Sequence, residues 1–223
     1  MKKRGRPKLD FTPTEEAILM HIAENGPTHY KALFTEHRIA TRRAVRNAEN
    51  ALLREKHLLK MIDTDERFII KPLDLTFSGV LYILTKLSDE EILSMKIVSI
   101  YKDHIYFQDL DLLLKSDMSL GLWWIQSLRR VSSYLKLWNM DEDQIKANLL
   151  VGMMKEAYTA PEKVKENAQI GFFANAYPLL ADLLDSAIKP VSSEEEVFII
   201  AGKSLTPIFE LVSNFFKSKK NKS

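Results

Sequence analysis

The segment from residue 41 to residue 57, TRRAVRNAENALLREKH, carries basic and amide side chains at helical spacing. Wound as a helix with about 100° between successive residues, one side presents three guanidinium groups, two amides and no carboxylate. These side chains belong to Arg42, Arg43, Arg46, Asn47 and Asn50. Arginine pairs with guanine edges and phosphates, and asparagine pairs with adenine edges. The segment therefore predicts a helix that binds the major groove of DNA, with a solvated helix face as the ordinary alternative.

Two predicted helices precede this segment and would position it. Thr12, Pro13 and Glu15 form a capping-box signature that predicts a helix start, and Asn25-Gly26-Pro27 predicts its end. A second helix is predicted over residues 28–37, followed by a short turn and then the basic helix. The basic helix would pack on its neighbours through the opposite side, formed by Val45, Ala48 and Leu52. This order is typical of a helix-turn-helix arrangement, in which the second helix enters the groove.

The pattern changes after His57. Residues 58–63 and 68–71 predict two strands, joined by a polar turn over residues 64–67. Three helices followed by a β-hairpin resemble the winged helix-turn-helix family. Leu75-Thr76-Phe77-Ser78-Gly79 also resembles the step that follows the wing in many archaeal and bacterial regulators of this family. The resemblance covers about residues 11–87.

This resemblance implies a role for individual residues. Lys31 and Arg38 match positions that contact phosphates, and Arg67 matches the tip of the wing. Four residues match the groove-facing positions of a recognition helix: Arg42, Arg43, Arg46 and Asn47. The wing is short, and the acidic residues around Arg67 would repel phosphate, which counts against a DNA contact by the wing and favours packing against a protein partner.

The first residues form a basic arm. Residues 2–8 are KKRGRPK, and a segment with so many like charges is expected to be flexible. Its centre, Arg4-Gly5-Arg6-Pro7, resembles an AT-hook, whose extended Arg-Gly-Arg lies in the minor groove of A·T-rich DNA. Arg4 and Arg6 would enter the groove where its potential is most negative. A solubilising tail and a general phosphate-binding arm are the alternatives.

From residue 88 onward the sequence predicts helices. Capping-box patterns begin at Ser88, Asp141, Thr159 and Ser193, and no alternating strand pattern occurs after Lys71. We expect four parts: a flexible arm (1–10), a winged helix-turn-helix domain (11–87), an all-α dimerisation or effector domain (88–216) and a basic tail (217–223). The predicted fold class is therefore mainly α, with three helices and a β-hairpin wing ahead of an all-α C-terminal domain.

A long apolar seam is predicted within a helix over residues 118–138. Its members recur at spacings of four and three: Leu120, Trp124, Leu128, Val131, Leu135 and Trp138. Such a seam serves either as a homodimer interface or as a contact with another helix of the same chain. A dimer is attractive because one recognition helix contacts few base pairs and a two-fold pair doubles the site.

Composition argues against an enzyme. The chain has no cysteine, and its five histidines form no pair with the spacing of a metal site. The one cluster of acids and imidazole, around Asp103-His104, has no second histidine. Nucleotide-binding and hydrolase motifs are missing from the sequence. We therefore expect no catalytic residues, no cofactor and no metal, and we expect no membrane span because polar residues interrupt the most apolar run. Two roles are open for a set of apolar residues, the lining of a pocket for an unidentified apolar effector and ordinary core: Gly171, Phe172, Phe173, Tyr177 and Phe198.

The charge distribution supports a polyanionic partner. Residues 1–87 contain 16 Lys and Arg against 11 Asp and Glu, while residues 88–223 contain 16 against 19. We predict a cytoplasmic, nucleoid-associated transcriptional regulator that binds double-stranded DNA, with a possible A·T preference, as a homodimer. The alternatives are a DNA-binding accessory factor of a mobile element, for replication or partition, and a protein–protein adaptor whose winged helix does not contact DNA.

Overall fold

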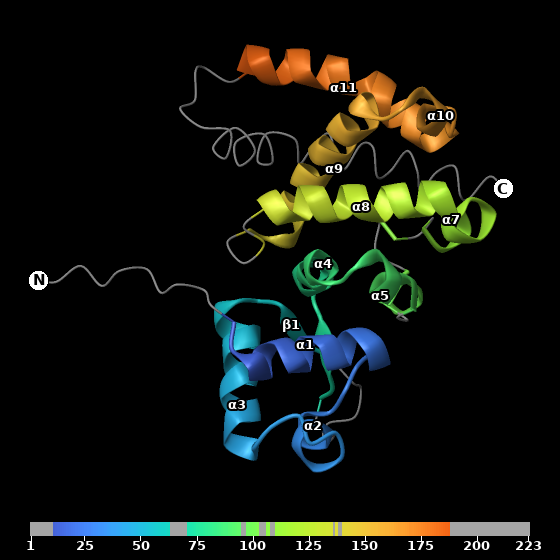
Figure 1. Cartoon of the computed structure of the whole chain (residues 1–223). Coiled ribbons are helices and arrows are strands. Elements are labelled where there is room, and N and C mark those ends of the chain that lie inside the picture. The colour runs from blue at the N-terminus through green and yellow to red at the C-terminus, as the bar shows by residue number, and fades with distance from the viewer. Residues whose placement is uncertain are drawn as a thin grey trace, which may run out of the picture.

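The computed structural model shows a mainly α-helical protein. Within the described residues it has one two-stranded antiparallel hairpin, which comes after the first helices (Figure 1). The arm, the tail and Arg67 lie outside the described residues. The structure describes residues 11–62, 71–94, 97–102, 106–107, 110–135, 137 and 140–187. In this part of the chain no helix is long and apolar enough to cross a membrane.

The first helix, α1 (Pro13–Asn25), begins as its sequence predicts. The Thr12 hydroxyl accepts from the Glu15 amide at 3.3 Å, and the Glu15 carboxylate accepts from the Thr12 amide at 2.6 Å. Both bonds of the capping box are therefore present. The helix ends at Gly26, where φ is +82°.

The next helices are α2 (Tyr30–Thr35) and α3 (Arg42–Asn50), and α3 continues into a wider turn of π type, η1 (Ala51–Glu55). The predicted start of α2 was two residues too early, because Thr28 is extended and pairs with Leu73 through two backbone hydrogen bonds of 2.9 Å. Arg38 lies in the turn between the helices with φ +49°, and the Ile39 amide donates to the Leu33 carbonyl. The turn therefore needs a left-handed residue, although no glycine marks it in the sequence.

The hairpin pairs β1 (Leu59–Met61) with β2 (Leu73–Leu75), with Leu59 opposite Leu75. The predicted second strand at residues 68–71 was wrong at Lys71, which is not in a strand, and residues 68–70 lie outside the described residues. The prediction missed the β2 residues because their position depends on burial against α1, a distant part of the chain. Both leucines of β2 are almost fully buried.

A tight contact joins the hairpin to the next helix, α4 (Phe77–Lys86). The Thr76 hydroxyl donates to the His57 carbonyl at 2.8 Å and accepts from the Gly79 amide at 3.1 Å. A Cβ atom at Gly79 would lie 2.2 Å from the Leu58 carbonyl oxygen. The Leu75–Gly79 step therefore fixes α4 against the backbone at the end of η1, and only glycine fits at its last position.

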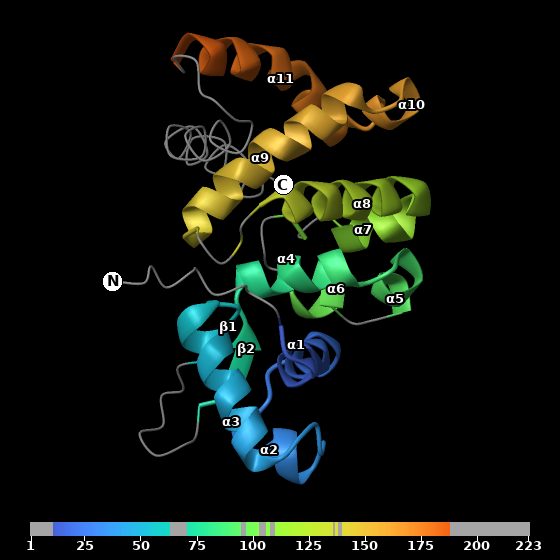
Figure 2. The same ribbon diagram turned by 60° about the vertical axis from the view of Figure 1, so that its left-hand side comes forward.

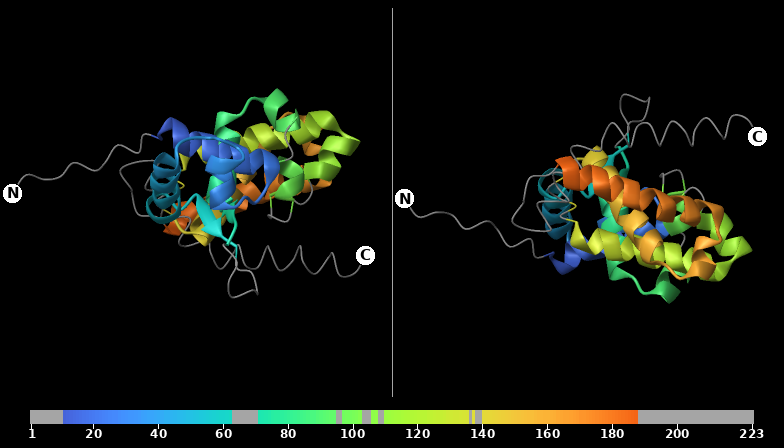
Figure 3. Two further views of the ribbon diagram at one scale, coloured as in Figure 1. Left: turned by 90° about the horizontal axis from the view of Figure 1, so that it is seen from below. Right: turned by 90° about the horizontal axis from the view of Figure 1, so that it is seen from above.

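The helix α4 lies between the first elements and the remaining helices (Figures 1 and 2). All residues from Phe77 to Leu84 are buried. The helices beyond it are α5 (Asp89–Ser94), α6 (Ile97–Ile100), α7 (Leu110–Ser116), α8 (Met118–Tyr134), α9 (Glu142–Thr159), α10 (Glu162–Lys165) and α11 (Ala168–Ala187). Seen from above, α11 lies over α9, with which it has its most extensive contact (Figure 3).

Two of the predicted capping boxes are confirmed and one is wrong. Ser88 exchanges both bonds with Glu91, and Asp141 exchanges both bonds with Gln144. Thr159 instead ends α9, and its hydroxyl donates back to carbonyls of that helix. The pattern failed there because Pro161 caps α10. The box predicted at Ser193 lies outside the described residues.

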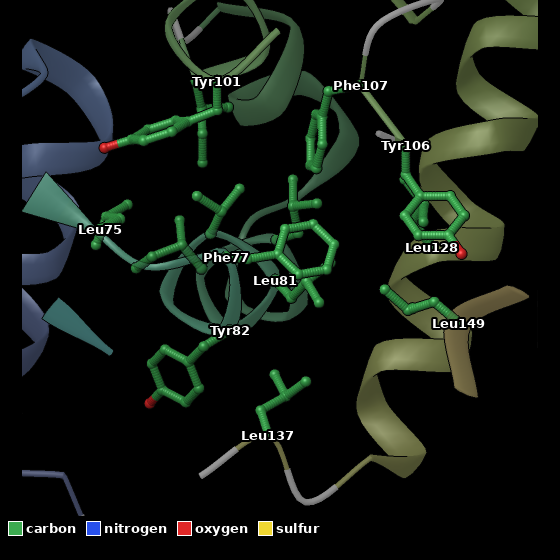
Figure 4. Packing of buried hydrophobic residues seen from close by; sticks show 14 of the residues in the cluster. Leu75, Phe77, Leu81, Tyr82, Tyr101, Tyr106, Phe107, Leu128, Leu137 and Leu149 are labelled. Atoms are coloured by element: carbon green, nitrogen blue, oxygen red, sulfur yellow. The ribbon is translucent and has the colours of Figure 1, made fainter. Parts of the chain in front are cut away.

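A single hydrophobic cluster extends through the molecule. Phe77 and Leu81 of α4 lie at its centre, with Leu75 and Tyr101 on one side and helices α8 and α9 on the other (Figure 4). The rings of Phe77 and Tyr106 lie 6.3 Å apart. The elements that carry α3 and the helices beyond α4 are therefore packed through a common core.

Candidate nucleic-acid interface

The helix α3 packs against the protein on one side, and its other side is exposed to solvent. Val45 and Leu52 have no exposed surface and Ala48 has 4%. These residues pack towards α1 and α2, as the sequence predicts. The opposite side is exposed and carries all five predicted groove-facing residues: Arg42, Arg43, Arg46, Asn47 and Asn50. Figure 1 shows α3 at one edge of the molecule, with α1 and α2 to its right.

Most of these polar side chains have no hydrogen-bond or ion-pair partner among the described residues. In the part of the chain that the structure describes, the side chains of Arg43, Arg46, Asn47 and Asn50 make no hydrogen bond or ion pair. Their donors are therefore available to a ligand without the loss of an existing bond. A rigid helix with free guanidinium and amide groups can form bidentate contacts with base edges or phosphates.

Arg42 differs from the others because it is tied to α2. Its backbone carbonyl accepts a hydrogen bond of 3.1 Å from the Tyr30 hydroxyl, and its guanidinium carbon lies 5.9 Å from the centre of the Phe34 ring. These contacts fix the start of α3 relative to α2. Thr41 caps the same end through its hydroxyl, which accepts from the Ala44 amide. Arg42 therefore positions α3 as well as adding charge to its surface.

The two predicted phosphate contacts are also exposed. Lys31 lies in the first turn of α2, and Arg38 lies in the left-handed position before α3. Neither side chain has a hydrogen bond or ion pair among the described residues. The structure thus places cationic groups on α2, on the turn and on α3, which are successive elements in contact with one another.

One cation of this region was not predicted as a contact. Arg54 is exposed on η1, four residues after Asn50, and this helical spacing was the signal that could have found it. Burial raises the pKa of the neighbouring Glu49, while the charges of Arg46 and Arg54 oppose that rise. Glu49 therefore lies at the edge of the basic face and interacts electrostatically with two of its arginines.

Lys56 does not belong to the exposed face, although it is a cation directly after η1. Its ammonium lies 2.8 Å from Glu15 Oε1, with 7% and 4% of the two side chains exposed, and 3.9 Å from the centre of the Phe11 ring. Burial opposes the charge of Glu15, but hydrogen bonds from Lys56 and Thr12 outweigh it and lower the pKa of this carboxyl. Lys56 is a structural cation that joins the end of the basic helix to α1.

The ring of a histidine in α1 contacts the ring of a histidine that follows α2. The ring centres of His21 and His37 lie 4.1 Å apart, and His21 Nε2 is buried without a hydrogen-bond partner among the described residues. Burial lowers the pKa of His21, the charge of His37 lowers it further, and the charge of Glu24 opposes the shift. Sequence patterns do not predict this contact because its two members lie on different elements.

The apolar seam predicted as a dimer interface on α8 is buried within the chain. Trp124, Leu128, Val131 and Leu135 are at most 6% exposed, and Leu120 is partly buried. Trp138 lies outside the described residues. The seam packs on α4 and α9, and a Cβ at Gly152 of α9 would lie 2.3 Å from a Val131 methyl carbon. These side chains therefore cannot form a subunit interface without opening the core, which corrects their predicted role.

Several other predicted features lie outside the described residues. Arg4, Arg6, Arg67, His104 and the tail fall there. In the described residues no group of three or more His, Asp or Glu side chains is placed to hold a metal ion. The predicted effector pocket is partly core, because Phe173 is buried and its ring stacks on that of Trp124, with 5.9 Å between the ring centres.

No family model matches the chain, and the comparisons with curated proteins and with solved structures give no match.

Proposed function

We propose that this protein binds specific sequences of double-stranded DNA and acts as a transcriptional regulator in the form of a homodimer. In this proposal residues 11–87 form a winged helix-turn-helix domain with α3 as its recognition helix. The order α1, α2, α3, β1, β2 supports it. Thr28, which lies between α1 and α2 in the chain, pairs with Leu73 and so adds a third short extended segment beside the hairpin. This segment also fits a winged helix-turn-helix domain.

The free polar face of α3 carries the proposal. A surface helix with charged side chains is common, but here the guanidinium and amide groups are concentrated on one face. Among the described residues, the side chains of Arg43, Arg46, Asn47 and Asn50 make no hydrogen bond or ion pair. Arg46, Asn47 and Asn50 lie at spacings of one and three residues along this face. In the major groove, arginine would donate to guanine and asparagine would pair with adenine. Lys31 and Arg38 would fix the register through phosphates.

The arm and the wing complete the proposed contact. Arg4 and Arg6 would enter an adjacent minor groove, and Arg67 would approach the backbone from the wing; all three lie outside the described residues. A homodimer would double the number of base pairs contacted. Its interface must use residues other than the buried seam of α8.

Fluorescence anisotropy of the full chain with labelled random and A·T-rich duplexes tests the proposal. The logarithm of the association constant is expected to fall linearly with the logarithm of salt concentration, by about 0.9 for each phosphate contact. Duplex binding with this dependence is the expected result. Failure to bind either duplex at low salt would contradict DNA binding and favour the protein–protein adaptor.

A further inference from the structure

We infer that the contact between His21 and His37 is a pH switch that acts on the proposed DNA interface. Protonation of His21 separates the two rings, loosens the turn before α3 and so lowers the affinity for duplex DNA in mild acid. This inference rests on the proposed function and adds a form of regulation to it. It follows from the place of the two histidines in the fold and from the hydrogen bonds around the His21 ring.

The ring contact connects α1 with the turn that leads into α3. His21 lies in α1, and His37 follows Glu36, the residue at which α2 ends. The ring centres of the two histidines are 4.1 Å apart. His37 directly precedes Arg38, whose backbone is left-handed, and lies four residues before Thr41, which caps α3. Loss of the ring contact therefore frees a segment that positions both Arg38 and the start of α3.

The hydrogen bonds of His21 favour its neutral form. The side-chain nitrogen of Asn25 donates to the His21 carbonyl at 3.0 Å and lies 3.3 Å from His21 Nδ1. Because this amide nitrogen can only donate, Nδ1 is the acceptor and the neutral ring carries its proton on Nε2. Nε2 is buried without a hydrogen-bond partner among the described residues. A second proton would have to go to Nδ1, where it would face a donor and break the bond with Asn25.

Burial and a like charge also oppose the protonation of His21. Burial lowers the pKa of His21, the charge of His37 lowers it further, and the charge of Glu24 on the same helix opposes the shift. Charged residues of α2 and of the elements packed against α1, which are α3, α4 and β2, are not among the causes of this shift. Once the rings separate, the pKa of His21 returns towards its ordinary value of 6.5. A fall in pH through this value therefore favours the separated state.

The geometry fits a proton switch and not a shared metal ion. Two imidazoles that bind one tetrahedral metal ion have ring centres about 5 Å apart, because each nitrogen lies about 2.0–2.1 Å from the metal. The rings of His21 and His37 are closer than this, at 4.1 Å, and inclined by 43°. In the part of the chain that the structure describes, no third His, Asp or Glu is placed with them to hold a metal ion.

The direction of the pH effect distinguishes this switch from a simple effect of net charge. Protonation of exposed histidines such as His29 and His57 adds positive charge, which strengthens binding to a polyanion. Net charge alone would therefore make the protein bind DNA more tightly in acid. With the switch, affinity falls in acid, because the fraction of the protein in which the turn is correctly positioned decreases.

Fluorescence anisotropy of the full chain tests the switch, with a duplex selected from a random library by the same protein. At constant salt, the dissociation constant is expected to rise at least about threefold between about pH 7.5 and about pH 5.5. His21→Phe keeps an aromatic ring beside His37 but cannot take up a proton, so its affinity should not fall in acid. His29→Gln, at an exposed position, should retain the fall and is the control.

His37→Gln provides a second variant, because it changes an exposed residue and leaves the interior intact. It removes the charge that opposes protonation of His21, so the loss of affinity in acid should be smaller. Unchanged or higher affinity of the unmodified chain in acid, or an equal fall in His21→Phe, would overturn the inference but leave the proposed function intact. Failure of the unmodified chain to bind any duplex at neutral pH would instead overturn the proposed function.

Nuclear magnetic resonance without DNA tests the connection between the ring and the turn. The Ile39 amide donates to the Leu33 carbonyl at 2.9 Å, so its resonance reports on the turn. In the unmodified chain this resonance should shift with the same apparent pKa as the His21 ring, and in His21→Phe it should not follow that titration. A His21 ring that titrates while the Ile39 resonance stays constant would overturn the switch, whatever the protein binds.

Discussion

The Lys56 ammonium lies 2.8 Å from Glu15 Oε1 in the interior, and these residues are 41 positions apart in the chain. The pair joins the end of the basic helix to the first turn of α1. Phe11 covers it through its ring, and Thr12 shares the carboxylate. The contact therefore joins the basic helix to α1, and its loss is expected to lower stability and, under the proposed function, to weaken DNA binding as well.

Lys56→Met is expected to lower the free energy of unfolding by about 3–5 kcal/mol at neutral pH, because it leaves the Glu15 carboxylate buried without its counter-ion. Urea unfolding measures this change. The pKa of Glu15 is lowered in the folded protein, so the stabilisation by the pair is present above the ordinary value of 4.5 and is lost as pH falls through the folded value. The difference between the two proteins should therefore shrink in acid. A pH-independent difference would indicate lost packing instead.

His21 should make the fold sensitive to mild acid. Its pKa is lowered below the ordinary 6.5, so the unfolded chain binds a proton more readily than the folded protein. Stability is therefore expected to decrease as pH falls through about 6.5. In His21→Gln this decrease should be smaller, as followed by thermal unfolding at several pH values. His29→Gln, at an exposed position, is the control; an equal effect of both variants would show that the His21–His37 contact is not responsible.

Arg38 combines backbone strain with a proposed phosphate contact. A left-handed residue with a side chain costs about 1–2 kcal/mol, part of which glycine recovers. Arg38→Gly is therefore expected to raise the free energy of unfolding by about 0.5 kcal/mol or more and to weaken duplex binding. Arg38→Ala, which retains the strain, should weaken binding equally without the gain in stability. Unchanged affinity in both variants would remove Arg38 from the interface.

Gly79 should tolerate no side chain. A Cβ atom would lie 2.2 Å from the Leu58 carbonyl oxygen, and the contact involves backbone on both sides. Gly79→Ala is expected to lower the free energy of unfolding by about 1–3 kcal/mol or more. Lys86→Ala, at the exposed end of the same helix, should change it by less than about 0.5 kcal/mol. Denaturant unfolding that gave similar values for both variants would contradict the described contact.

Local patterns were sufficient for the start of α1 and for the buried side of α3. The capping box at Thr12 and Glu15 depends on residues three positions apart, and the buried side of α3 follows from its helical period. Local patterns failed where distant contacts decide the structure. The strand β2 lies at Leu73–Leu75 because its two leucines are buried against α1. The sequence pattern instead predicts a strand at residues 68–71, of which Lys71 is not in a strand and residues 68–70 lie outside the described residues.

The candidate site was predictable only in part. The exposed position of Arg43, Arg46, Asn47 and Asn50 follows from one helical period. Sequence could not show that Lys56 is buried, because its partner Glu15 lies on another helix. For the same reason it could not decide whether the α8 seam packs within the chain or between chains. Arg54 was missed although its spacing from Asn50 was visible.

We propose that the exposed polar face of α3 binds DNA, and the affinity of Arg46→Ala for a selected duplex is the decisive measurement. Anisotropy should show a loss of about 1–3 kcal/mol and a relaxed preference at one base pair, because a bidentate contact with guanine is lost. Lys163→Ala, which removes a charge from the exposed surface of α10, should bind as tightly as the unmodified chain. Equal affinity of the unmodified chain and Arg46→Ala, with an unchanged sequence preference, would contradict the role of α3.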